Sequence, residues 1–139
     1  MNFVVVDASV WVARLVPKDI FHSPVRLWMN HLRSEGTELI APSLILVEVA
    51  GVISRRTGSA QLAKRAAIQL QSLPGFRLVE MDNLLLQKAA QLAAELGLRG
   101  ADSIYVAVAS HLEVPLVTLD EDQRTRSKKK VEVLPISHG

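Results

Sequence analysis

The sequence predicts an α/β fold in which a parallel β-sheet is covered by helices on both faces. Short apolar runs rich in β-branched residues alternate with segments of helical spacing along the 139 residues, which is the pattern of β-α-β units. The first run, Phe3–Val6, has no polar alternation, as expected of a strand buried on both faces. The length and the absence of repeats or linkers predict a single domain, residues 1–139.

The elements follow from this alternation and from helix start and stop signals. Strands are expected at residues 3–6, 38–41, 76–81 and 114–119, with a weak final strand at 131–136. Helices are expected at 8–16, 24–33, from Pro42 or Ser43 to about 56, at 60–73, 83–96 and 102–112, and residues 121–130 form a charged loop or short helix. Ser23, Ser59 and Asp82 precede helices as N-caps, and Gly58 and Gly97 follow them. The interiors of two helices, the one that ends at about residue 56 and the one at 102–112, are apolar nearly all round. This predicts that both helices are largely buried.

Composition excludes several classes of protein. The chain has no Cys, which removes disulfides, thiolate metal sites and Cys nucleophiles and fits a reducing compartment. No apolar run is long enough to span a membrane, and Asp7 interrupts the N-terminal run, so no signal peptide is expected. We therefore expect a cytoplasmic protein without a membrane partner. A net charge of +2 and a pI of about 9.2 permit a polyanionic partner.

Four acidic residues lie at the ends of predicted strands or inside apolar helices. Asp7 and Asp120 each directly follow a β-rich run, where open α/β sheets bind ligands. Asp102 lies in the first turn of an apolar helix, and Glu48 is the only charge inside another. Each Asp alone could be a helix cap. A buried Glu48 needs a partner, either a metal ion or an arginine, with Arg55, Arg56 and Arg99 available.

Taken together, the four carboxylates indicate a cation site. Four negative charges at one edge of a sheet would repel one another unless a cation lay between them. Oxygen ligands without Cys or suitably spaced His favour Mg²⁺ or Mn²⁺. Such an ion lowers the pKa of an attacking water and stabilises a leaving oxygen. The pattern therefore favours phosphodiester hydrolysis.

Four segments around these acids resemble a known family. They are Val-Val-Asp-Ala-Ser-Val (5–10), Pro-Ser-Leu-Ile-Leu-Val-Glu-Val (42–49), Leu-Arg-Gly-Ala-Asp-Ser-Ile-Tyr-Val-Ala-Val-Ala (98–109) and Leu-Val-Thr-Leu-Asp-Glu-Asp (116–122). In this order and spacing they are similar to the PIN-domain ribonucleases, among them the VapC-type toxins of toxin–antitoxin pairs. The fold implied is a three-layer PIN-like arrangement.

The resemblance also implies roles for particular residues. It implies that Asp7, Glu48, Asp102 and Asp120 are the catalytic, metal-binding acids, with Mg²⁺ or Mn²⁺ as cofactor. Ser9 and Thr118 would support the site through their hydroxyls, and Asp122 is a further supporting candidate or a solvated loop acid. The implied activity is endoribonuclease cleavage that leaves a 5′-phosphate and a 3′-hydroxyl. The implied partners are RNA, a second copy of the chain in a homodimer, and a VapB-like antitoxin that inserts into the acidic site.

A basic run follows Asp120. It consists of Arg124, Arg126, Lys128, Lys129 and Lys130. These side chains could guide RNA phosphates toward the metal, or they could form an ordinary solvated face.

Two other functions are compatible with parts of this pattern. A receiver-like signalling domain also binds Mg²⁺ with acids at strand ends, but it needs a Lys after a later strand, and none directly follows residues 116–119. A PIN-fold module that binds RNA without cutting it is the other alternative, and the intact acid set argues against it.

Overall fold

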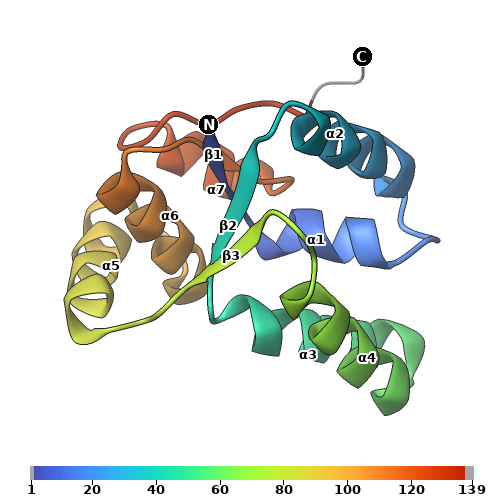
Figure 1. The fold of residues 1–139 in the computed structure, drawn as a ribbon. Coiled ribbons are helices and arrows are strands. Elements are labelled where there is room, and N and C mark those ends of the chain that lie inside the picture. Colours follow the sequence, from blue (N-terminus) through green and yellow to red (C-terminus); the bar gives the residue numbers. More distant parts are fainter. Residues whose placement is uncertain (1, 137–139) are drawn as a thin grey trace.

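The computed structural model describes residues 2–136, and the ends of the predicted domain, residue 1 and residues 137–139, lie outside them. The described chain has the predicted α/β architecture, shown in Figure 1. The strands are β1 (Phe3–Val6), β2 (Glu38–Pro42), β3 (Phe76–Val79) and β4 (Leu116–Val117). The helices are α1 (Ala8–Leu15), α2 (His22–Ser34), α3 (Ile45–Thr57), α4 (Ala60–Gln71), α5 (Asn83–Leu96), α6 (Gly100–Leu112) and α7 (Glu121–Ser127).

The four strands form one parallel sheet in the order β3-β2-β1-β4. β1 is central, since Val5 pairs with Ile40 of β2 and with Leu116 of β4. The Asp7 N–H donates to the Val117 carbonyl over 3.0 Å, which continues the pairing to the carboxyl end of β1. The carboxyl ends of β1, β2 and β4 therefore meet at one edge. This order differs from the 2-1-3-4-5 order of receiver-type domains, so the receiver hypothesis was wrong.

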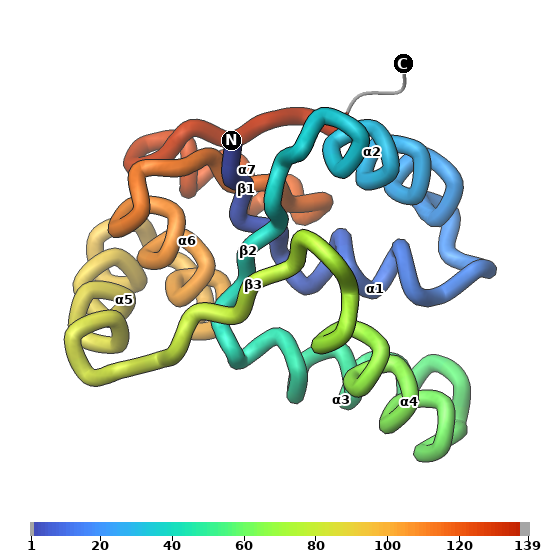
Figure 2. The backbone as a smooth tube through the Cα atoms, in the orientation of Figure 1, coloured from blue at the N-terminus to red at the C-terminus, as the bar shows by residue number. Residues whose placement is uncertain are grey.

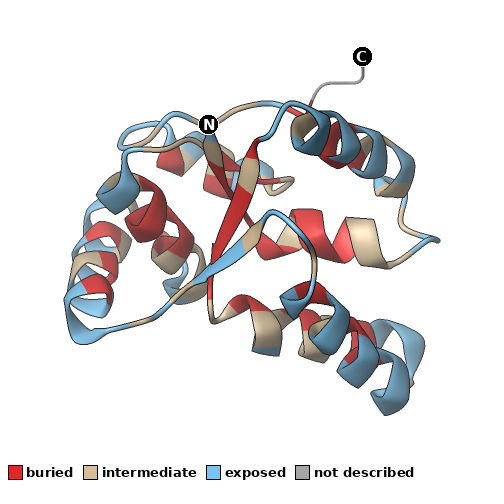
Figure 3. Ribbon diagram, viewed as in Figure 1, coloured by how far each residue is buried: buried red, intermediate tan, exposed pale blue. Residues whose placement is uncertain are grey.

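Helices cover both faces of the sheet (Figures 1 and 2). α5 and α6 pack together on one face, and α1 and α2 pack together on the other. α3 and α4 form a helical hairpin beside α1. Burial is concentrated in β1, β2 and β4 and in the helix faces toward the sheet, whereas the edge strand β3 is exposed or half-buried (Figure 3). α6 contributes an almost continuous buried stretch from Tyr105 to Ala109, as its apolar sequence predicted.

Three predicted helix starts were wrong by two or three residues, and one of them is that of α6, which begins at Gly100 and not at residue 102. α3 begins at Ile45 and not at Pro42 or Ser43, because Pro42 still pairs with Val79 in the sheet. α2 begins at His22, so Ser23 lies inside the helix and is not its cap. Ser59 and Asp82 cap α4 and α5 as expected.

Two larger expectations were also wrong. Residues 131–136 form no strand, since their only pairing among the described residues is a single bridge between Leu116 and Val133. α3 is not buried all round, because only the face with Ile45, Val49 and Ile53 is buried while Val47 is 67% exposed. No helix within residues 2–136 is long and apolar enough to cross a membrane.

Candidate active site

Asp7 lies at the end of the central strand and is the most deeply buried acid of the candidate site. Its side chain caps α1 by accepting from the Ser9 N–H, so the expected cap exists alongside any other role. The residue is only 5% exposed. Burial raises the pKa of Asp7 above its ordinary value, although hydrogen bonds from Ser9 and Thr118 oppose the effect. The fold therefore holds a carboxylate where a bare negative charge is unfavourable.

The hydroxyls of Ser9 and Thr118 both contact Asp7 and fix its orientation. Ser9 Oγ donates to Asp7 Oδ2 over 2.6 Å and accepts the Leu119 N–H over 3.0 Å. Thr118 Oγ1 lies 3.1 Å from both Asp7 Oδ2 and Gln123 Oε1, and its single hydrogen can bond only one of them at a time. The Asp120 N–H also donates to Thr118 Oγ1. The two hydroxyls thus connect the ends of β1 and β4 through side chains.

Glu48 on α3 is held by a tyrosine and not by an arginine. Tyr105 Oη on α6 donates to Glu48 Oε1 over 2.6 Å, so the alternative of a pairing with Arg55, Arg56 or Arg99 is not the one found. Burial raises the pKa of Glu48, the bond from Tyr105 opposes this, and the charges of Asp7 and Asp102 raise it further. Glu48 therefore faces the same region as these two acids.

Asp102 projects from the first turn of α6. It is not the cap of the helix, because Arg99 occupies the N-cap position, and Arg99 itself makes no side-chain cap bond. Burial raises the pKa of Asp102, the charge of Asp7 raises it further, and an ion pair with Arg99 lowers it without reversing the shift. A helix cap alone does not explain this carboxylate.

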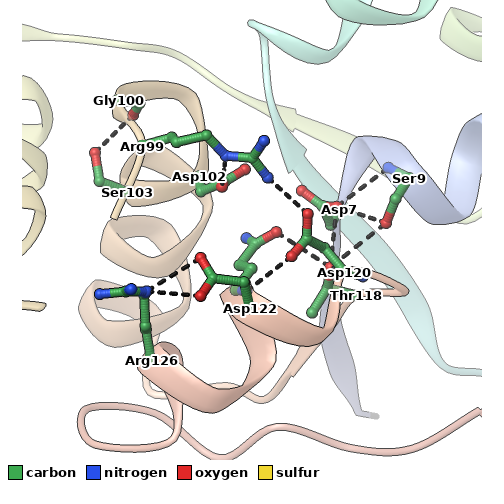
Figure 4. Close-up of polar contacts among 11 residues, drawn as sticks. Asp7, Ser9, Arg99, Gly100, Asp102, Ser103, Thr118, Asp120, Asp122 and Arg126 are labelled. Atoms are coloured by element: carbon green, nitrogen blue, oxygen red, sulfur yellow. Dashed lines mark hydrogen bonds and ion pairs between the residues drawn. The ribbon is translucent and has the colours of Figure 1, made fainter. Parts of the chain in front are cut away.

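Asp120 has a different environment from the other three acids. It caps α7 through a 2.9 Å bond from the Gln123 N–H to Oδ1. Arg99 Nη2 donates to its other oxygen over 2.6 Å. The helix amide and the guanidinium lower the pKa of Asp120, so mutual repulsion does not raise the pKa of all four acids. Figure 4 shows Arg99 reaching from the start of α6 toward Asp120.

The oxygen donors suit a hard divalent cation, although the acids are not gathered into a finished site. The charge of Asp7 raises the pKa values of Glu48 and Asp102, and the charge of Asp102 also raises that of Glu48, which a cation between them would relieve. Within residues 2–136, no three Asp, Glu, His or Cys side chains converge closely enough to form a ready metal site. The donor chemistry fits Mg²⁺ or Mn²⁺, and small side-chain movements would have to complete the coordination.

The other candidate residues lie around α7. Asp122 is exposed. Its oxygens Oδ1 and Oδ2 accept hydrogen bonds from Arg126 Nε over 2.9 and 3.1 Å, so Asp122 is paired with an arginine on the surface. Arg124 donates to the Thr118 carbonyl and supports the loop before Asp120. Lys128, Lys129 and Lys130 are exposed beyond the far end of α7, about 10 Å from Asp120 along a helix of this length.

An open hollow of about 300 Å³ adjoins Ser9 and Glu48. Phe21, Arg56 and Leu119 also line it, so an aromatic ring and a guanidinium lie near the acids. A cavity of similar volume, about 320 Å³, lies elsewhere, among Trp11, Arg14 and Phe76. That cavity contains no acidic side chain, so the chemistry of the residues, not cavity size, marks the candidate site.

The sequence analysis missed Tyr105 and Gln123, and it named Arg99 only as a possible partner of Glu48 and not of Asp102 and Asp120. Tyr105 is the only tyrosine of the chain and lies three residues after Asp102 on an apolar helix, where a hydroxyl needs a partner. Arg99 lies three residues before Asp102, so it was a possible ion-pair partner for that acid. Gln123 is fully buried, and nothing in the sequence around it predicted that burial.

Comparison with known proteins assigns the family. Residues 4–129 match the PIN domain, so the chain belongs to the PIN-domain family. PIN domains are typically nucleases and generally use divalent metals. No curated protein matches the sequence.

Solved structures with the same fold include toxins of toxin–antitoxin pairs. VapC20 of Mycobacterium tuberculosis, a sarcin–ricin loop cleaving toxin, is 22% identical with a TM-score of 0.75, covering 95% of this chain and 99% of that one. VapBC2 of Rickettsia felis, bound to a promoter DNA fragment, is 11% identical with a TM-score of 0.73, covering 95% and 97%. FitAcB of Neisseria gonorrhoeae is 20% identical with a TM-score of 0.61, covering 95% and 96%. At these identities the likeness establishes the fold.

Proposed function

We propose that this protein is a Mg²⁺- or Mn²⁺-dependent endoribonuclease and the toxin of a VapBC-type pair. The observation that carries the proposal is the buried carboxylate of Asp7, fixed by Ser9 and Thr118, facing Glu48 and Asp102. Such an arrangement lowers the stability of the fold unless a bound cation offsets the negative charge. Membership of the PIN family supports the same interpretation.

Asp7, Glu48, Asp102 and Asp120 would hold the ion. A bound Mg²⁺ or Mn²⁺ supplies acidification of an attacking water and stabilisation of the leaving oxygen. Ser9 and Thr118 hold Asp7 in one orientation, and Tyr105 does the same for Glu48. The hollow beside Ser9 and Glu48 gives an RNA strand room next to the acids.

The proposed partners are RNA, a VapB-like antitoxin and a second copy of the chain. The toxin–antitoxin relatives named above support the antitoxin, and the homodimer follows from the family resemblance. The exposed Lys128, Lys129 and Lys130 would attract RNA phosphates from the solvent side of α7. The proposed place of action is the cytoplasm, where both RNA and an antitoxin would be present.

The test is cleavage of a mixture of structured RNAs by the purified protein. We expect cleavage with Mg²⁺ or Mn²⁺ and none in excess EDTA, with products that carry a 5′-phosphate. Undiminished cleavage in EDTA would contradict the proposal. Co-expression of the small reading frame adjacent to the gene should suppress cleavage if that frame encodes the antitoxin.

One observation favours a second candidate, RNA binding without cleavage. In residues 2–136 the acids are not assembled into a ready metal site, and Arg99 already pairs with two of them. RNA binding of equal strength in Mg²⁺ and EDTA, without cleavage in either, would establish this candidate.

A further inference from the structure

Two acids of the candidate site share a cation that the chain itself supplies. Arg99 Nε lies 3.0 Å from Asp102 Oδ2, and Nη2 lies 2.6 Å from Asp120 Oδ2 (Figure 4). We propose that Arg99 is a displaceable counter-ion, which holds Asp102 and Asp120 together until a divalent cation takes its place. This inference rests on the proposed metal-dependent function.

The oxygen atoms involved show which acid Arg99 controls. Asp120 uses Oδ1 to cap α7 and Oδ2 to bind Arg99, so both of its oxygens are occupied. Asp102 uses only Oδ2 for Arg99, which leaves Oδ1 able to bind an ion while Arg99 stays in place. Arg99 therefore decides whether Asp120 can join the metal ligands.

Electrostatics makes the two cations competitors. A divalent ion on Asp120 Oδ2 would lie close to the guanidinium, and like charges at such distances repel. The Arg99 side chain is 70% exposed while that of Asp102 is 16% exposed. The arginine side chain can therefore turn into water at little cost, whereas the fold fixes the backbone positions of the two acids and leaves them only small side-chain movements.

The position of Arg99 in the chain allows this exchange without a change of fold. Arg99 is the N-cap residue of α6 but makes no side-chain cap bond to the helix. Within residues 2–136, its side chain forms hydrogen bonds to the two acids alone. Release of the guanidinium therefore leaves the start of α6 unchanged, and only the link between α6 and the β4–α7 loop is broken.

The test is a calorimetric titration of the folded protein with MnCl₂, with no RNA present. Three variants are compared with the wild type: Arg99→Ala, Arg99→Lys and Arg126→Ala. Arg126 is the matched control, because it pairs with Asp122 on α7 and contacts neither Asp102 nor Asp120. Thermal melting of each protein in EDTA and in MnCl₂ gives a second readout that does not depend on activity.

We expect Arg99→Ala to bind Mn²⁺ about fivefold more tightly than the wild type, the scale of removing one exposed ion pair. Arg99→Lys should also bind more tightly than the wild type, because a single ammonium does not reproduce the planar fork that reaches both acids. Arg126→Ala should match the wild type. In EDTA, Arg99→Ala should have a lower melting temperature than the wild type. Addition of MnCl₂ should narrow or reverse that difference in melting temperature.

Several results would overturn the inference. Equal or weaker Mn²⁺ binding by Arg99→Ala would show that Arg99 does not compete, while the proposed function would stand. An equal gain in Arg126→Ala, or no gain in Arg99→Lys, would show that net charge and not the bridge sets the affinity. If no protein of the series bound Mn²⁺, both the inference and the proposed function would fail.

Discussion

Tyr105 donates a 2.6 Å hydrogen bond to Glu48 and thereby joins α6 to α3 across the candidate site. Tyr105 is fully buried, and both burial and the neighbouring Glu48 charge raise its pKa. The phenol therefore stays protonated and acts as a donor. A carboxylate that would otherwise rotate freely is held toward Asp7 and Asp102.

The Tyr105→Phe variant tests this positioning. Phe keeps the packing of the ring but removes the hydrogen-bond donor. We therefore expect the free energy of unfolding to fall by about 1–2 kcal/mol. RNA cleavage should fall about tenfold, the scale of one missing hydrogen bond in the transition state, because Glu48 loses its fixed orientation. Chemical denaturation and single-turnover cleavage measure the two effects. Unchanged cleavage in a stably folded variant would show that the orientation of Glu48 does not matter.

The Asp102→Asn variant should separate function from stability. Because the pKa of Asp102 is raised in the fold, the charged side chain is unfavourable there, and a neutral amide should stabilise the metal-free protein by about 1 kcal/mol. Cleavage should be abolished. Excess Mg²⁺ should reduce the difference in free energy of unfolding between Asp102→Asn and the wild type, because the wild type binds the ion more tightly. A lower melting temperature of the variant in EDTA would contradict the idea of unfavourable charge at this position.

The metal-free protein should become more stable as the pH falls from 8 toward 5. Asp7, Glu48 and Asp102 have raised pKa values in the fold, above 3.8 for Asp and 4.5 for Glu. Between those ordinary values and the raised ones, the folded protein holds more protons than the unfolded chain, so lowering the pH adds stability. Asp120 has the opposite shift and removes stability only as the pH falls through its ordinary value and below.

Urea denaturation in EDTA at pH 5 and pH 8 measures this effect. Asp7→Asn should reduce the difference between the two pH values, because it removes the most buried of the three groups. Equal stability of the wild type at both pH values would mean that the fold does not raise the pKa values of these three carboxylates.

The lysines beyond α7 should contribute to RNA affinity through charge alone. Replacing Lys128, Lys129 and Lys130 by Ala should weaken RNA binding and reduce the salt slope of log Kd by about 0.7 for each phosphate that the variant no longer neutralises. A control that removes the exposed charges of Lys18, Lys64 and Arg65 should leave the slope unchanged. Equal slopes for the wild type and the α7 variant would assign the three lysines to an ordinary solvated face.

Elements with local signals could be predicted closely from the sequence. α5 runs from Asn83 to Leu96 as expected, since Asp82 caps its start and Gly97 adopts the left-handed conformation at its end. The region from Val114 to Ile136 could not be predicted as well. Whether its residues pair depends on neighbours elsewhere in the fold, and β4 shortens to two residues while 131–136 makes one bridge.

The contacts of the candidate site also fall into local ones, which the sequence could indicate, and long-range ones, which it could not. Ser9 follows Asp7 by two residues and Thr118 precedes Asp120 by two, so both lie inside segments that resemble the PIN family, and that resemblance named them. Tyr105 and Glu48 are 57 positions apart, and only the packing of α6 against the sheet brings them together. Arg99 lies near Asp102 in sequence, but its contact with Asp120, 21 positions away, depends on the tertiary fold.

The most direct test of the proposed nuclease site compares two Asp→Asn variants at saturating Mn²⁺. Asp7 and Asp82 both follow a strand and both cap a helix through an Asp oxygen, and Asn caps helices nearly as well as Asp. We predict that Asp82→Asn cuts a labelled RNA at the wild-type rate, while Asp7→Asn shows no cutting above background and remains folded. Cutting by Asp7→Asn at the rate of Asp82→Asn would show that Asp7 is only a helix cap and would contradict the proposed metal site.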